Sequence, residues 1–131
     1  GYAYLALINI YADAPSQGLK MIRKAMQLNP DYPAQYLSVL GQAHYSLKEY
    51  EDAVPVFRNA INKNFSLLTA HIMLTATLNQ LGLGDEAIWA ADQLHAISPG
   101  FSTEDLARIF PLKDPLQLQT LTSNLQMAGI N

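Results

Sequence analysis

The sequence predicts an all-α fold in which about three helix pairs stack into an array, followed by a helical tail. Small and apolar residues recur at steps of 35 and then 34 residues through the first hundred positions. Amphipathic stretches of helical period alternate with breaks rich in proline, glycine and asparagine. Half of the 131 residues are hydrophobic, which suffices for a packed core. Because a lone helix pair cannot bury its apolar face, neighbouring pairs must share one core.

The repeat divides residues 1–100 into three units, 1–31, 32–66 and 67–100, with an extra residue absorbed at Tyr32-Pro33. Each landmark occurs once per unit. The landmark sets are Leu5, Leu40 and Leu74; Gly18, Ala53 and Ala87; Ile22, Phe57 and Ala91; Ala25, Ala60 and Leu94; and Pro30, Phe65 and Pro99. A period near 34 with two helices per unit is typical of the tetratricopeptide repeat.

Local signals place the helices within each unit. Pro15 and Pro33 suit the first turn of a helix, whereas Asn29-Pro30 and Ser98-Pro99-Gly100 end one. The segment from Leu81 to Asp85 predicts a turn between two helices. The expected helices are 2–12 and 16–28 in unit one, 34–46 and 50–63 in unit two, and 67–81 and 85–97 in unit three.

Unit two resembles the tetratricopeptide repeat family most clearly. Its Gly41 and Ala53 allow two helices to approach closely, and Phe57 fills the wedge between units. The resemblance covers Gly1 to Gly100. It implies a right-handed superhelical solenoid that binds proteins or peptides, with the first helix of each unit lining a concave surface. The departures from the family pattern are Asn9 in unit one and His71 and Thr75 in unit three.

Residues 101–131 form the tail. A cap at Ser102 predicts a short helix that ends near Phe110-Pro111. A second helix is expected from Asp114-Pro115 to Gly129. Because Pro115 to Asn131 carries no charged side chain, we expect this helix to pack as a cap on the exposed end of unit three. Its apolar face consists of Leu118, Leu121 and Leu125.

The tail also has a resemblance of its own. Its segments Pro99 to Ser102, Phe110 to Pro115 and Ala128 to Ile130 resemble the ends of tetratricopeptide regions in bacterial regulators. Such proteins carry an adenylate or guanylate cyclase domain, or a winged-helix DNA-binding domain, upstream. The resemblance implies that Asn131 lies near a natural C-terminus. The apolar start without a cap predicts that Gly1 is not the natural start, and we expect the C-terminal regulatory region of a larger bacterial, cytoplasmic protein.

Composition argues against several classes of partner. The net charge of −3 provides no basic field for nucleic acid or anionic lipid. The most apolar stretch, Gly1 to Ala12, is too short to span a bilayer and lacks the basic start of a secretory signal. The absence of cysteine excludes a disulfide framework and a thiolate metal site. We therefore expect neither nucleic acid nor a membrane as a direct partner.

No residue pattern predicts catalysis, a cofactor or a metal site. The three histidines, His44, His71 and His95, are separated by 27 and 24 residues, which matches no metal-ligand motif. Of the three, only His95 has an acidic residue, Asp92, within one helical turn. No serine lies in the glycine pattern of a nucleophile elbow. The chain is therefore predicted not to be an enzyme.

The distribution of charge predicts the binding surface. Gly1–Ala12, Pro33–Leu47 and Asn64–Gly84, which hold the first helices of the units, contain no charged residue. The concave surface should therefore be nearly neutral and suit an extended or helical segment of low charge. Gln35 and Gln42 would supply amide hydrogen bonds and Tyr45 an amphipathic anchor. The predicted site is Ala3, Leu7 and Ile10 in unit one, Gln35, Ser38, Gln42 and Tyr45 in unit two, and Thr69, Ile72, Ala76 and Asn79 in unit three.

Several interpretations stay open at this point. The first is an interaction module for a protein or peptide, which could be another domain of the same chain. The second is self-association that dimerises an upstream catalytic or DNA-binding domain through the apolar first helix. The third is small-molecule sensing by Gln42, Tyr45 and Asn79. Alternatively, the predicted concave residues have no binding role.

Overall fold

The computed structural model describes residues 1–131 and consists of helices, without a strand. The elements are α1 (Tyr2–Tyr11), α2 (Pro15–Leu28), α3 (Ala34–Ser46), α4 (Tyr50–Lys63), α5 (Leu68–Gln80), α6 (Gly84–Ile97), the 3-10 helix η1 (Thr103–Asp105), α7 (Leu106–Ile109) and α8 (Pro115–Met127). The six helices expected in the three units are confirmed, and their ends differ from expectation by at most one residue.

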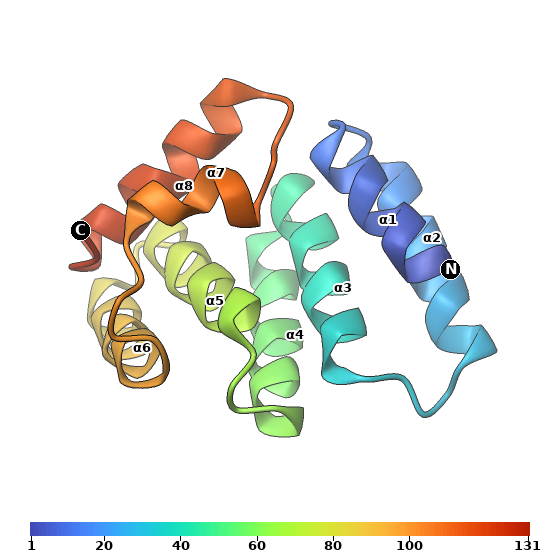
Figure 1. The fold of residues 1–131 in the computed structure, drawn as a ribbon, viewed down its shortest axis with the longest axis horizontal. Helices are drawn as coiled ribbons and strands as arrows, with labels where there is room; N and C mark the ends of the chain where they lie inside the picture. The colour runs from blue at the N-terminus through green and yellow to red at the C-terminus, as the bar shows by residue number, and fades with distance from the viewer.

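The helices stack in chain order. α1 packs against α2, α3 against α4 and α5 against α6, and the second helix of each pair also packs against the first helix of the next (Figure 1). The first helices α1, α3 and α5 therefore lie next to one another. The largest group of buried apolar side chains is shared by units two and three and the tail, while a smaller group joins unit one to α3. Unit one is thus the least enclosed part of the array.

Small residues occur where helices approach most closely, as the repeat predicted. A Cβ added at Gly41 would overlap the ring of Phe57, which is fully buried. In unit one, a Cβ at Gly18 would lie 2.7 Å from Cγ1 of Ile10 and 2.9 Å from the carbonyl oxygen of Ala6. Both distances are too short for carbon, so glycine at these two positions sets the spacing within a pair.

The three departures from the family pattern each have a local partner. The Asn9 side-chain amide donates to the Leu5 carbonyl oxygen at 2.8 Å. Nε2 of His71 lies 2.7 Å from the carbonyl oxygen of Phe65, and the Thr75 hydroxyl donates to the His71 carbonyl at 2.8 Å. The fold therefore accommodates these polar side chains without leaving a buried group unpaired.

Both tail helices begin at the expected caps. The Ser102 hydroxyl accepts from the Glu104 N–H at 3.0 Å, and the Asp105 carboxylate accepts from the Ser102 N–H at 3.0 Å. The Asp114 carboxylate accepts from the Leu116 N–H at 2.9 Å. These bonds satisfy donors that would otherwise be free at each helix start.

The position of α8 differs from the expectation. It packs against α5, the first helix of unit three, and not as a cap on α6 (Figure 1). The chain crosses the array before α8 begins, and the Lys113 N–H donates to the Tyr11 carbonyl oxygen in unit one at 2.8 Å. Phe101, Leu106 and Phe110 anchor this crossing because all three are buried in the main core. The tail therefore covers α5 and reaches α1 and α3 through single hydrogen bonds to Tyr11 and Tyr45.

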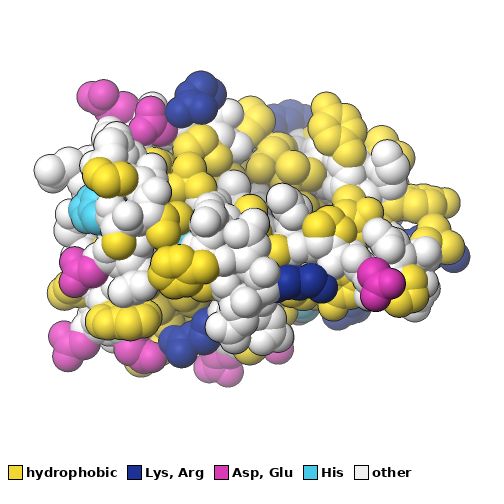
Figure 2. Space-filling model, turned by 60° about the horizontal axis from the view of Figure 1, so that its bottom comes forward, with side chains coloured by type: hydrophobic (Ala, Val, Ile, Leu, Met, Phe, Trp, Pro, Cys, Tyr) yellow, Lys and Arg dark blue, Asp and Glu magenta, His cyan; other side chains and the backbone are white.

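Charge is unevenly distributed over the molecule. In Figure 2, acidic side chains gather over the end of the array formed by α6, while hydrophobic side chains dominate the end formed by α1 and α2. Exposed apolar residues on α1 include Tyr4, Leu5 and Ile8, which are 68%, 47% and 44% exposed. No helix is long and apolar enough to cross a membrane.

Candidate interaction surface

Three of the predicted polar residues, Ser38, Gln42 and Thr69, form a hydrogen-bonded chain with Tyr11 across the three units. The Tyr11 hydroxyl donates to Oε1 of Gln42 at 3.3 Å, and Nε2 of Gln42 donates to the Ser38 hydroxyl at 3.3 Å. The Ser38 and Thr69 hydroxyls are 2.9 Å apart. Gln42 and Ser38 are almost fully buried. These side chains therefore join α1, α3 and α5 to one another instead of presenting free donors to a partner.

One asparagine makes three side-chain hydrogen bonds from the tail to this surface. Nδ2 of Asn124 on α8 donates to Oε1 of Gln80 at 2.9 Å and to the Tyr45 hydroxyl at 3.4 Å. Its Oδ1 accepts from Nδ2 of Asn79 at 2.9 Å. Asn124 is 6% exposed, so its amide replaces solvent for three side chains of units two and three. The sequence contains a signal for this role, because Asn124 is a polar residue beside Leu121 and Leu125 on an otherwise apolar face.

The predicted site divides into two parts. Gln35 is exposed and Ala3, Leu7 and Thr69 are partly exposed; we name Leu7, Gln35 and Thr69 the open edge. The remaining predicted residues are enclosed by the neighbouring helices and the tail, and we name them the covered part. The covered part consists of Ile10, Ser38, Gln42, Tyr45, Ile72, Ala76 and Asn79. Thus a fully open concave surface at all the predicted positions is not what the structure shows, because the tail occupies much of it.

The two tyrosines nearest the tail are held neutral. Burial raises the pKa of Tyr11 to about 12. Burial also raises the pKa of Tyr45 to about 12, although the hydrogen bond from Asn124 acts in the opposite direction. The ring of Tyr11 meets Phe110 edge to face at 6.5 Å, and that of Tyr45 meets Tyr50 at 5.4 Å. Both hydroxyls therefore stay protonated to a higher pH than the hydroxyl of a tyrosine in water.

The chain has low sequence similarity to known proteins. No protein-family model matches the chain. Protein KINESIN LIGHT CHAIN-RELATED 1 of Arabidopsis thaliana is 27% identical over 99 residues, which are 71% of this chain and 16% of that protein. The chain thus spans a small fraction of the length of this curated relative.

Solved structures match nearly the whole chain. MamA is 21% identical and superimposes with a TM-score of 0.71 over 97% of this chain and 74% of its own. YrrB, described as a tetratricopeptide protein with an unusual peptide-binding site, is 16% identical, with a TM-score of 0.66 over 97% of this chain and 70% of its own. The fold is a tetratricopeptide-repeat solenoid. The resemblance of the tail to the ends of cyclases and winged-helix regulators stays a prediction.

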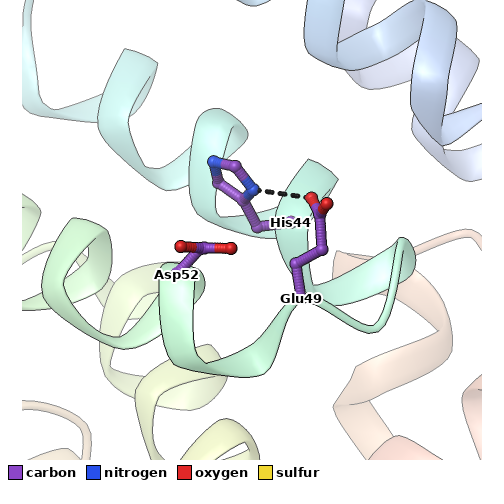
Figure 3. Close-up of side chains that lie close together, drawn as sticks. All are labelled: His44, Glu49 and Asp52. Carbon is purple, nitrogen blue, oxygen red and sulfur yellow. Dashed lines mark hydrogen bonds and ion pairs between the residues drawn. The ribbon is translucent and has the colours of Figure 1, made fainter.

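The turn inside unit two of this tetratricopeptide solenoid gathers side chains that sequence spacing did not associate. Nδ1 of His44, at the end of α3, lies 2.9 Å from Oε1 of Glu49, and Asp52 of α4 lies beside them (Figure 3). One ligand atom from each lies within 4.8 Å of the others. Glu49 is five residues from His44, which is more than one helical turn, so the turn between α3 and α4 and not helical spacing brings the two side chains together. Because Glu49 and Asp52 are exposed, the His44–Glu49 contact serves as a hydrogen bond across the turn.

A cavity of about 400 Å³ lies between the solenoid and the tail. Ile10, Gln42 and Tyr45 of the covered part line it from one side, and Phe110 and Leu121 of the tail from the other. Its charged lining comes from turns and was not predicted. The charged residues are Asp13 after α1, Lys48 after α3 and Asp114 before α8.

Proposed function

We propose that this chain is a protein-interaction scaffold, not an enzyme, that binds a protein segment of low charge on its concave face. The observation that carries the proposal is α8 itself. This helix carries no charged side chain, and it packs on α5, the first helix of unit three, through apolar contacts and the amide of Asn124, which also bonds to Tyr45 of α3. The surface is therefore complementary to an uncharged helical segment, which here comes from the same chain.

A partner segment would bind along the open edge, next to the tail. Leu7, Gln35 and Thr69 belong to three successive units, so a segment lying across them would contact α1, α3 and α5 together. Gln35 offers a free amide, and Thr69 can share its hydroxyl with a ligand. The covered part shapes this edge by fixing the spacing of the first helices. The peptide-binding site named for YrrB, which has the same fold, supports a peptide-binding role for this chain.

The larger context follows from the tail resemblance alone. We infer that the array is the C-terminal regulatory region of a bacterial, cytoplasmic signalling or transcription-regulating protein. In such a protein the bound segment could come from an upstream domain.

Site-specific photo-crosslinking tests the interaction surface. A photoreactive phenylalanine derivative would replace Gln35 in the full chain, and the matched control would carry it at Asn59, which is exposed on α4. We expect a cross-linked segment poor in Asp, Glu, Lys and Arg at position 35 and not at position 59. Equal labelling at both positions, or capture of strongly charged segments at position 35, would contradict the proposal.

Self-association is the second candidate, and the exposed face of α1 favours it. Tyr4, Leu5 and Ile8 form an apolar surface near one end of the array, where a solenoid would continue by stacking. Replacing Ile8 with Glu should convert a concentration-dependent oligomer into a monomer in light scattering. A wild-type chain that stays monomeric at high concentration would exclude this candidate.

A further inference from the structure

The cavity between the solenoid and the tail has the size and the wall chemistry of a ligand site. Its volume of about 400 Å³ lies within the range of small-molecule pockets. The floor is apolar and includes Ile10, Met73 and Phe110. Asp13 and Lys48, of opposite charge, come from two different turns of the array. A ligand here would contact both the solenoid and the tail.

The backbone at these two charged residues is unusual. Asp13, Lys48 and Gly82 occupy the same repeat position, two residues after the last residue of α1, α3 and α5 respectively. All three have positive φ, at 66°, 62° and 77°. Glycine adopts this conformation without steric cost, whereas a lysine there is disfavoured. Unit three has glycine at this position, so the turn forms without a side chain there. The side chains of Asp13 and Lys48, which line the cavity, are therefore not required by the turn.

The charges of the lining are available to a ligand. Lys48 takes part in no ion pair, and the nearby Tyr50 hydroxyl has no side-chain hydrogen bond. Asp13 accepts one hydrogen bond from Gln117 at 3.0 Å, which leaves its second oxygen free. The third charged residue, Asp114, caps α8, where its charge favours the helix dipole. The ammonium group of Lys48 and one carboxylate that does not cap a helix, that of Asp13, therefore remain above an apolar floor.

We propose that this cavity binds a small zwitterion with an apolar side chain, of the class of the free α-amino acids. Lys48 and the Tyr50 hydroxyl bind the carboxylate, Asp13 binds the ammonium group, and the apolar floor receives the side chain. A molecule that lacks either charged group leaves Asp13 or Lys48 without its ionic partner. The bound zwitterion also clamps the tail against the solenoid.

Isothermal titration of the full chain with matched probes tests the ligand class. The panel consists of L-leucine, L-phenylalanine, phenethylamine, which lacks the carboxylate, and 3-phenylpropionic acid, which lacks the ammonium group. At least one amino acid should bind saturably, and each truncated probe should bind at least about tenfold more weakly than phenylalanine or leucine. Binding of neither amino acid up to about 10 mM, or equal binding of a truncated probe, would overturn the proposal.

Substituting Lys48 by Gly separates ligand binding from folding. Because Gly82 shows that the position accepts glycine, Lys48→Gly should unfold at the same or a higher temperature and lose amino-acid binding at least about tenfold. Lys20→Met removes a charge from the exposed surface of α2 and should leave binding unchanged. Unaltered binding by the Lys48→Gly variant would show that the zwitterion does not occupy this cavity.

Hydrogen exchange reports on the clamping of the tail. The bound amino acid should slow exchange of the amides between Leu112 and Gln117, which enter the cavity wall from the tail side. Exchange in α6, which contributes no residue to the cavity, is the internal control. Unchanged exchange at residues 112–117 in the presence of a saturating amino acid would contradict the clamped arrangement.

Discussion

The first helices α1 and α5 are both uncharged and apolar but have very different surroundings. Both lack charged residues, yet α5 buries nine consecutive residues, Ala70 to Leu78, whereas α1 buries only Ala6 and Ile10. The difference arises from their neighbours, because α5 lies between α4, α6 and α8 while α1 contacts α2 and α3. The burial of a helix in a stacked array is thus set by what lies on either side of it, and the tail completes the enclosure of α5.

Truncating one leucine in α8, which encloses α5, and one leucine in the exposed helix α1 should give the largest difference in the free energy of unfolding. Leu125 of α8 is fully buried in the main core, and Leu125→Ala should lower the free energy of unfolding by about 2–5 kcal/mol. Leu5 of α1 is 47% exposed, and Leu5→Ala should cost under about 1 kcal/mol. Urea denaturation measures both. Equal losses would mean that the tail does not enclose α5.

Although α1 has few buried residues, it packs closely against α2. A substitution at Gly18 of α2 tests this close packing. Gly18→Ala should destabilise the chain by about 1–3 kcal/mol, because the new Cβ would lie 2.9 Å from the Ala6 carbonyl oxygen, a backbone atom that cannot rotate away. Gly100→Ala is the control, since nothing lies within 4 Å of a Cβ there. Thermal unfolding of the two variants compares them. A neutral Gly18→Ala would show that α1 can shift freely on α2.

Tyr45, which the tail covers, should make the folded protein less stable at alkaline pH. Because the folded-state pKa of Tyr45 is raised above its usual value near 10, its contribution is fully present below pH 10 and is lost as pH rises toward 12. The loss is on the order of 2 kcal/mol. Tyr45→Phe should flatten the decline between pH 10 and 12, whereas Tyr4→Phe on exposed α1 should not. An unchanged profile for Tyr45→Phe would place its hydroxyl in solvent.

The helix pairs could be predicted from sequence because the repeat constrains them at many positions. Gly18, Gly41 and Phe57 each perform the packing role that their spacing indicated. The packing position of α8 could not be predicted, because an apolar face of leucines does not specify which helix it packs against. The crossing anchored by Phe110, the backbone bond from Lys113 to Tyr11 and the bonds of Asn124 to Asn79 and Gln80 together place α8 on α5.

The candidate sites were predictable to different degrees. The neutral first helices predict a binding surface, and spacing alone could not show that Gln42 and Ser38 of that surface bond to neighbouring helices. Those contacts depend on how closely the helices approach in three dimensions. The cavity charges had a readable signal, because aligning Asp13 and Lys48 with Gly82 shows side chains where a turn of this kind favours glycine.

The most direct test of the account is a double-mutant cycle between the tail and the solenoid. Its central claim is that α8 lies on the concave face, with Asn124 bonded to Asn79 at 2.9 Å. The free energies of unfolding of Asn79→Ala, Asn124→Ala and the double variant give the coupling between the two side chains. The account predicts a favourable coupling of about 1 kcal/mol. Strictly additive effects of the two substitutions would contradict it, because they would show that α8 does not contact this surface through Asn124.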